Sequence, residues 1–303
     1  MYKKDIFGVR VDMGLNMQEA VSIIENLLKG AEVGHLVCTT NPEFIIDAQK
    51  DEEFKKIVNS SALSVPDGVG VSAADYYLSR TEKLESKNNL VSKIILPFKK
   101  FGLGMWTGLN VFGGKLSEKR ISGVSLCEEL FKLSAQKGYS IFLLGGWPRD
   151  WTGKRIEMIE DFAQKTARVI AQKYPGVNII GATSKFSREE GDDEKTIEYI
   201  KSAMREKGVD TIDILLVAYN ANKQERWVVR NAHKLPARVS IGVGGTFDYI
   251  VGHYKQVPAI FTKMGLDWFF RLITQPFRMK RIFNAFPIFP IKIFLFSLKH
   301  KNK

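Results

Sequence analysis

The sequence is poor in the residues that build disulfide or metal frameworks. Its 303 residues include two cysteines, Cys38 and Cys127, without the paired spacing of a zinc site. The four histidines are scattered and no Asp-x-Asp triplet occurs, so a bound metal is not expected. Glycine (25) and proline (10) are near ordinary usage, which excludes collagen-like and low-complexity chains. The opening residues lack an apolar core, so we expect no secretory signal and a reducing cytosol.

Several nucleotide-binding and catalytic fingerprints are also missing. There is no G-x-G-x-x-G loop, no G-x-x-x-x-G-K-[ST] loop and no G-x-S-x-G elbow. These absences disfavour an NAD-dependent dehydrogenase, a P-loop protein and a serine hydrolase of the elbow type. No cofactor is therefore expected.

Acidic residues are outnumbered, with 33 Asp and Glu against 45 Lys and Arg, for a net charge of +12. The excess is confined to residues 81–120, with a net charge of +5, and residues 253–303, with +9; the remainder carries −2. These two basic segments are also apolar and lack an RNA-type stacking motif, so nucleic acid is not the expected partner. Two docking surfaces fit this distribution better.

Short apolar runs alternate with longer helical stretches through most of the chain. Strands connected by helices pair in parallel, which predicts an α/β fold with a Rossmann-like, mainly parallel sheet and helices on both faces. Ligands bind such sheets beyond the carboxyl ends of the strands. Strands are predicted at Leu36–Thr39, Leu63–Val65, Ser140–Leu144, Val177–Ile180, Ile214–Val217 and Val239–Val243, and helices at 42–58, 123–137, 154–173, 192–206 and 223–233.

Two segments break this rhythm and define the expected organisation. Residues 81–116 are rich in Lys, Gly and large apolar residues, with no clear strand or helix pattern. We predict an α/β core over residues 1–252 that carries this basic, apolar insertion. A helical, membrane-associating appendage is predicted over residues 253–303.

The appendage contains a 17-residue stretch with a single charge, Lys292. It is at the lower limit for crossing a bilayer and is interrupted by Pro287 and Pro290. Its composition of Phe, Ile and Leu between basic residues favours a position in the headgroup region. A spanning helix and burial in a homo-oligomer remain the alternatives.

Two strand-end loops are the first candidates for chemistry. Thr39, Thr40 and Asn41 precede Pro42, so a helix should begin here with free amides and hydroxyls that suit an anion or a sugar. A well-capped helix is the simpler interpretation. Asp67 stands in a Pro-Asp-Gly turn on what should be the neighbouring strand end. There it serves either as a turn residue or as a base that removes a hydroxyl proton.

Three later loops carry further candidates, each with a structural alternative. A Gly-Gly pair admits a phosphate or ribose, or makes a tight turn. A polar helix start holds phosphate or a sugar hydroxyl, or complements the helix dipole. A glycine-rich strand end precedes an acid that anchors a ligand or caps a turn. The residues concerned are Gly145, Gly146, Lys223, Gln224, Glu225, Gly244, Gly245 and Asp248.

Three arginines precede the apolar stretch. Spacings of seven and three place Arg271, Arg278 and Arg281 on one helical face if Pro276 only kinks the helix. Such a cluster suits a pyrophosphate, and a solvated basic face is the alternative. Asp192 and Asp193 lie together in a polar stretch and are expected to be solvated.

Taken in chain order, these motifs resemble the WecG/TagA/CpsF family of bacterial glycosyltransferases. The resemblance rests on TTNPEF, PDGVGV, KRISGVSL, IFLLGG, KQE, GVGGTFDYIVG and GLDWFFRLITQPFRMKR. It implies a metal-independent enzyme that moves a sugar with inversion from a UDP-sugar to an undecaprenyl-diphosphate-linked sugar. Such transfer takes place at the cytoplasmic, anionic leaflet and feeds teichoic acid or other surface polysaccharides. The donor is N-acetylmannosamine-type or another hexose.

The resemblance also implies roles for single residues. Asp67 matches the general base and Thr39 the active-site threonine, while Gln224 matches the glutamine of KQE. Arg120 matches an arginine near the phosphates. The three C-terminal arginines match those thought to close over the active site at the membrane.

The chain departs from the family pattern in several places. Asn220 and Asn222 replace a glycine and a proline before KQE, Gln256 replaces a basic residue, and Gln275 replaces a glutamate. The resemblance does not account for the 81–116 insertion. The alternative function is a non-catalytic protein that binds nucleotide-sugars or acts as a scaffold at the membrane.

Overall fold

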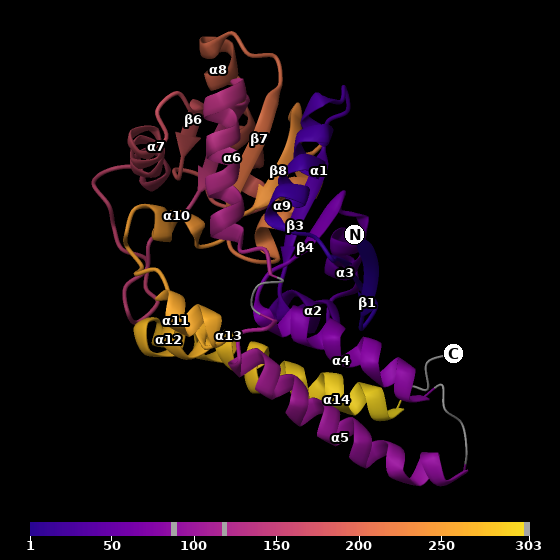
Figure 1. Cartoon of the computed structure of the whole chain (residues 1–303). Coiled ribbons are helices and arrows are strands. Elements are labelled where there is room, and N and C mark those ends of the chain that lie inside the picture. The colour runs from indigo at the N-terminus through magenta and orange to yellow at the C-terminus, as the bar shows by residue number, and fades with distance from the viewer. Residues whose placement is uncertain (86–89, 117–119, 300–303) are drawn as a thin grey trace.

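The computed structural model describes residues 1–85, 90–116 and 120–299. An α/β body occupies the upper part of Figure 1, and a layer of helices runs beneath it and extends past its edge. The N-terminal strand and the C-terminal helix lie on the same side of the molecule. Segments far apart in the chain therefore meet under the body.

A six-stranded sheet forms the centre of the body, with the strand order β4-β3-β8-β7-β5-β6. Every pair in it is parallel. This confirms the predicted fold class and all six predicted strands, because apolar strands that alternate with helices must return in the same direction. The strands are β3 (His35–Thr40), β4 (Leu63–Pro66), β5 (Ser140–Gly145), β6 (Asn178–Thr183), β7 (Ile212–Ala218) and β8 (Ala237–Gly242).

Helices cover both faces of the sheet. Two hydrophobic core clusters lie on opposite faces of the sheet, and each packs against its own group of helices. The first group is α1 (Met17–Lys29), α6 (Gly123–Lys137), α7 (Phe162–Lys173) and α10 (Thr246–Ile250). The second is α3 (Glu52–Ser60), α8 (Asp193–Lys207), which follows the short turn η2 (Glu190–Asp192), and α9 (Lys223–Asn231).

Side-chain caps explain where two predicted helices were wrong. The stretch 42–58 is two helices, α2 (Pro42–Ala48) and α3, because Asp51 accepts a hydrogen bond from the Phe54 amide and starts a new helix. The stretch 154–173 becomes helical only at Phe162, where Asp161 caps α7. The helices predicted at 123–137, 192–206 and 223–233 are confirmed within two residues.

A third core cluster lies outside the sheet. The antiparallel hairpin of β1 (Tyr2–Ile6) and β2 (Val9–Met13) packs there with α2, α4 (Val69–Glu85) and α14 (Phe289–Lys299). Phe289 and Ile293 are its contributions from α14 and are almost fully buried. This cluster fastens the end of the chain to its beginning.

The segment 81–116, which showed no clear pattern, is helical up to Phe112 where it is described, and residues 113–116 form a turn. It contains the end of α4 and the whole of α5 (Leu90–Phe112); residues 86–89 lie outside the described ranges. The helical period was obscured because the outer face of α5 is apolar rather than polar. Lys100 of α5 is buried, pairs with Glu85, and donates to the Ser297 carbonyl of α14.

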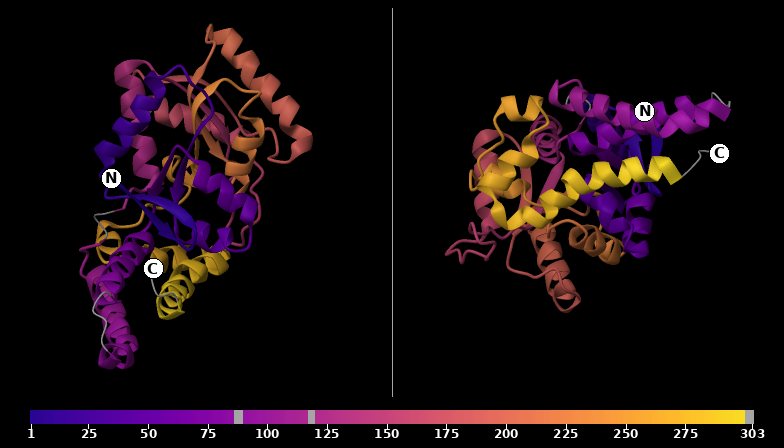
Figure 2. Two further views of the ribbon diagram at one scale, coloured as in Figure 1. Left: turned by 90° about the vertical axis from the view of Figure 1, so that its right-hand side faces the viewer. Right: turned by 90° about the horizontal axis from the view of Figure 1, so that it is seen from below.

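The C-terminal appendage is a chain of short helices followed by one longer helix, seen from below in Figure 2. Residues Pro276–Lys299 are long and apolar enough to cross a membrane by length and composition. The prediction that three arginines share one helical face was wrong. Gln275 has φ −140° and ψ 61°, which ends α12, so Arg271 and Arg278 lie on different helices. The elements are α11 (Ala259–Lys263), α12 (Asp267–Thr274), η3 (Pro276–Arg278), α13 (Met279–Phe283), η4 (Asn284–Ile288) and α14.

Candidate active site

A cavity of about 510 Å³ lies between the carboxyl ends of β3 and β4 and the helical layer. Its size suits a small-molecule site, and its place is where parallel sheets bind ligands. The predicted residues that line it are Asn41, Asp67, Arg120, Arg271, Arg278 and Arg281. The structure therefore brings together two strand-end loops, the start of α6 and the appendage.

Asp67 is the carboxylate that follows β4. Its amide donates to the Thr40 carbonyl at 2.8 Å, which ties the loop after β4 to the end of β3, as the spacing predicted. Burial raises the pKa of the Asp67 carboxyl, and the positive charges of Arg271 and Arg120 act against that rise. A carboxylate with a raised pKa beside cations is well suited to accept a proton.

Two of the four arginines are held by carboxylates across the cavity. Arg120 binds Asp267 of α12 through two hydrogen bonds of 2.8 and 3.0 Å. Arg281 binds Glu43 of α2 at 2.6 and 2.5 Å. Both pairs join the α/β body to the appendage, so they position the appendage over the cavity.

The other two arginines are available to an anion. Within residues 1–85, 90–116 and 120–299, neither Arg271 nor Arg278 forms an ion pair within 4.0 Å. The Arg278 guanidinium lies 5.1 Å from the Tyr254 ring centre and close to Gly245. Burial lowers the pKa of Arg278. A half-buried cation that forms no direct ion pair is stabilised by an incoming phosphate.

Asp248 and Gly245 lie next to Arg278 rather than on the cavity wall. Burial raises the pKa of Asp248 to about 6, with Arg278 and His253 acting against it. A side chain at Gly245 would stand 3.1 Å from the Arg278 guanidinium. Gly245 therefore leaves room for the Arg278 guanidinium, and the Asp248 carboxylate lies near its positive charge.

The start of α2 has the structure of a capped helix. The Asn41 side chain accepts from the amides of Glu43 and Phe44, both at 3.0 Å. Thr40 is fully buried and its hydroxyl contacts that of Ser64 at 2.7 Å. Thr39 is nearly buried beneath the start of α6, so Asn41 is the member of this loop that lines the cavity.

The Gly-Gly pair after β5 is covered by aromatic rings. A side chain at Gly145 would stand 2.6 Å from the Tyr219 ring, and one at Gly146 would stand 2.9 Å from Phe247. Both glycines have positive φ, of 82° and 89°. Neither lines the cavity, and their role in this structure is a tight turn under close packing.

The residues of the KQE motif form a buried hydrogen-bonded unit outside the cavity wall. Gln224 accepts from the Gly244 amide at 2.9 Å and donates to Glu225 at 2.7 Å. Burial raises the pKa of Glu225 to about 7. Lys223 is exposed. This unit holds the loop after β7 against the loop after β8.

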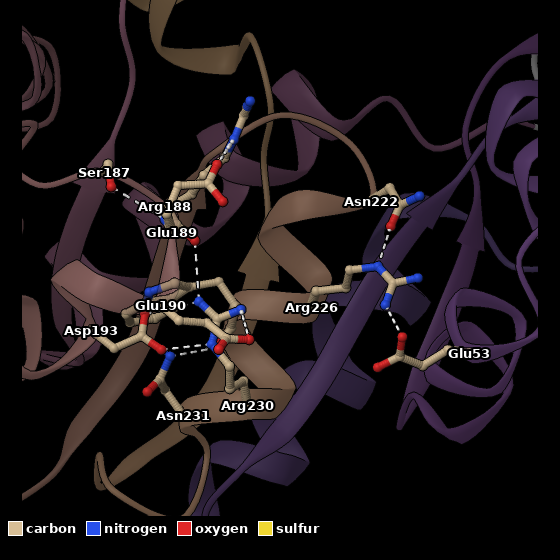
Figure 3. A network of polar contacts seen from close by, with 11 residues as sticks. Glu53, Ser187, Arg188, Glu189, Glu190, Asp193, Asn222, Arg226, Arg230 and Asn231 are labelled. Atoms are coloured by element: carbon tan, nitrogen blue, oxygen red, sulfur yellow. Dashed lines mark hydrogen bonds and ion pairs between the residues drawn. The ribbon is translucent and has the colours of Figure 1, made fainter.

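The loop before this motif explains two departures from the family pattern. Asn220 and Asn222 have φ of 70° and 69°, which Asn tolerates and Pro cannot adopt. The Asn222 side chain accepts from Arg226, which also binds Glu53 (Figure 3). Arg226 binds Asp51 as well. The loop is therefore ordered by its own asparagines.

A neighbouring cluster corrects one expectation for the acidic pair before α8. Asp193 is buried rather than solvated and binds Arg230 at 2.6 and 2.9 Å (Figure 3). Asp192 receives the Ser187 amide at 2.8 Å. Asp193 therefore joins α8 to α9, and Asp192 holds the segment that precedes α8.

Sequence reasoning missed several residues that form the cavity. Glu43 and Asp267 lie inside the motifs TTNPEF and GLDWFFRLITQPFRMKR. Each forms an ion pair, with Arg281 and Arg120 respectively, and their opposite charges are the signal in the sequence that could have pointed to these pairs. Trp268 lines the cavity from the same motif as Asp267. Gly104 and Gly108 of α5 also line it, and no pattern in the sequence points to them.

Comparisons with known proteins show which family the chain belongs to. The chain is 26% identical over 269 residues to the Bacillus subtilis (strain 168) N-acetylglucosaminyldiphosphoundecaprenol N-acetyl-beta-D-mannosaminyltransferase, covering 89% of this chain and 83% of the relative. It is 23% identical to the protein of the same name from Staphylococcus aureus (strain MRSA252), covering 96% and 92%. Residues 4–89 and 100–303 match the glycosyl transferase WecG/TagA/CpsF family. The chain therefore belongs to the WecG/TagA/CpsF family of glycosyltransferases.

Proposed function

We propose that this glycosyltransferase moves N-acetylmannosamine, or a related hexose, from a UDP-sugar to N-acetylglucosaminyl-diphosphoundecaprenol. The relatives' names supply the acceptor and the transferred sugar. The observation that carries the proposal is Asp67 in a cavity lined by four arginines. One carboxylate and several cations are the groups that glycosyl transfer to a diphospholipid requires.

The proposed reaction is a single displacement with inversion. Asp67 removes the proton from the acceptor hydroxyl, the hydroxyl oxygen attacks the anomeric carbon, and the bond to UDP breaks. The electron pair leaves with the UDP phosphate, and the proton rests on Asp67. Arg271 and Arg278 are the cations best placed to stabilise the negative charge that develops.

The start of α6 adds a second group of donors for phosphate. Ser122, Val124 and Ser125 line the cavity. The Ser122 side chain makes no capping hydrogen bond, so the first amides of this 15-residue helix lack a side-chain partner from their N-cap. Helix N-termini bind anions through such amides. We infer that arginines and amides, rather than a divalent metal, neutralise the diphosphate.

Membrane association is part of the proposal. Large apolar side chains are exposed along α5 and the appendage, among them Phe98, Leu109, Ile291 and Leu295. Phe289 and Ile293 anchor α14 to the body, which favours a helix lying on the surface over one that crosses the bilayer. We infer a peripheral position on the cytoplasmic, anionic leaflet, where the lipid-linked acceptor resides.

The test is a panel of UDP-sugars with a diphospholipid-linked N-acetylglucosamine acceptor, assayed with magnesium and with EDTA. We expect transfer of one sugar, the opposite anomeric configuration in the product, and equal rates in both conditions. Strict magnesium dependence contradicts the proposed charge stabilisation. UDP-sugar binding without turnover supports the non-catalytic alternative.

A further inference from the structure

Part of the cavity wall, here called the arm, is apolar. It runs between α5 and α4 on one side and the segment from α13 to α14 on the other. These helices contact one another and lie side by side under the body (Figure 2). The residues that line this arm are Gly70, Ala73, Gly104, Thr107, Gly108, Val111, Ile282, Ala285, Phe286 and Pro290.

Glycines of α5 give the arm its width. A side chain at Gly108 would meet no atom within 4 Å, and one at Gly104 would meet only Tyr77, at 3.8 Å. The hydroxyl of Thr107 donates to the Leu103 carbonyl of its own helix, at 2.8 Å. The wall therefore offers mainly apolar surface, because the Thr107 hydroxyl is already hydrogen-bonded within its helix. Such a wall suits a hydrocarbon rather than a sugar.

The cavity combines a polar and an apolar part. Asp67, Arg271 and Arg278, the groups suited to phosphate chemistry, line the same cavity as the arm. The helices that form the arm also carry exposed apolar residues, such as Leu109 of α5 and Phe283 of α13. A ligand with an anionic head and an apolar tail matches this combination. From Gly104 to Phe112 the helix rises about 12 Å, enough for the first part of such a tail.

We propose that this arm holds the first isoprene units of the acceptor's polyprenyl chain while the arginines hold its diphosphate. The inference rests on the proposed function, because the lipid-linked acceptor defines the tail. Gly108 is then a specificity-determining residue, since its missing side chain leaves space for the hydrocarbon. The chain passes from this groove directly into the bilayer beneath α5 and α14.

The test compares Gly108→Leu with Gly102→Leu. Gly102 lies on the same helix, is exposed, and does not line the cavity. A side chain there would also meet no atom within 4 Å. Both variants replace a helical glycine with a better helix former, so both should fold. Binding of farnesyl diphosphate and of inorganic diphosphate is measured by calorimetry on the full chain.

We expect Gly108→Leu to weaken farnesyl diphosphate binding at least tenfold, with inorganic diphosphate binding unchanged. Gly102→Leu should leave both affinities within twofold of the unmodified chain. Unchanged farnesyl diphosphate binding in Gly108→Leu, or an equal loss for both ligands, overturns the proposal. This binding assay needs no glycosyl transfer. It therefore tests the groove by itself, whereas the UDP-sugar panel tests the proposed function.

Discussion

The α/β body and the helical layer contribute to the active site in different ways. In the body, the glycine-rich loops are closed by their own neighbours, as with Gly145 under Tyr219 and Gly244 on Gln224. In the helical layer, Arg271 and Arg278 face the cavity and form no ion pair within 4.0 Å among the described residues. The glycine loops thus pack against their own neighbours, and the proposed phosphate-binding charge comes mainly from the appendage.

The two regions also differ in what covers their apolar residues. The sheet is sealed by helices on both faces, whereas α5 and the appendage leave large apolar side chains exposed. Contiguous exposed apolar surface of this kind marks an interaction site. The difference agrees with the proposed contact between the helical layer and the membrane.

The largest expected effect tests Asp67 of the body, the proposed general base. Replacement Asp67→Asn should lower the transfer rate about 10²- to 10⁴-fold, the usual contribution of a general base. Burial raises the pKa of Asp67, and the carboxylate is the active form, so activity should fall as the pH decreases through that raised pKa. UDP affinity serves as the control and should be unchanged. Full turnover by the variant contradicts the assignment.

A pair of variants tests whether the binding charge lies in the helical layer. Arg278→Ala should lower kcat/KM about 10- to 100-fold, since a hydrogen bond to a charged group contributes about 1.5–3 kcal/mol. Lys223→Ala removes an exposed cation from the KQE motif of the body and should change kcat/KM less than about twofold. Steady-state kinetics on the lipid-linked acceptor provide the measurement. A large loss of kcat/KM in Lys223→Ala together with a small one in Arg278→Ala contradicts this assignment.

The buried Glu225 makes a testable contribution to the stability of the body. Burial raises the pKa of Glu225 to about 7, so the folded state retains a proton that the unfolded state loses at lower pH. The free energy of unfolding should therefore fall by about 2–3 kcal/mol as the pH rises from about 4.5 to 7, and then level off. Glu225→Gln should reduce the pH dependence measured in urea unfolding curves by this amount, leaving the part that comes from other buried carboxyls such as Asp248. An unchanged slope means that the carboxyl is not the source.

The smallest expected effect concerns the exposed apolar residues of the layer. Leu109→Glu and Leu295→Glu should each weaken binding to vesicles of phosphatidylglycerol and phosphatidylethanolamine about tenfold, because burying a Leu side chain contributes about 1.5–3 kcal/mol. Val229→Glu is the matched control, since Val229 is exposed on α9 of the body. If all three variants lose the same amount of vesicle binding, α5 and α14 do not form the membrane contact, and the proposal is contradicted.

Local patterns predicted the body well because its elements follow local rules. Apolar runs specified all six strands, and Gly138 in the left-handed conformation ends α6 at the predicted residue. The misjudged helices share one cause, since the caps at Asp51 and Asp161 sit inside stretches whose composition reads as continuous helix. The pattern of α5 was hidden because its outer face is apolar.

The site itself was predicted only in its parts. The chemical character of Asp67 and of the arginines can be seen in the sequence. Their assembly into one cavity depends on the ion pairs Arg120–Asp267 and Arg281–Glu43, whose partners are 147 and 238 residues apart. The order of motifs along the chain determined the fold class and the glycosyltransferase family. Tertiary structure decided which motif residues face the cavity and which are packed away, because burial and long-range charge pairing depend on neighbours that local sequence does not contain.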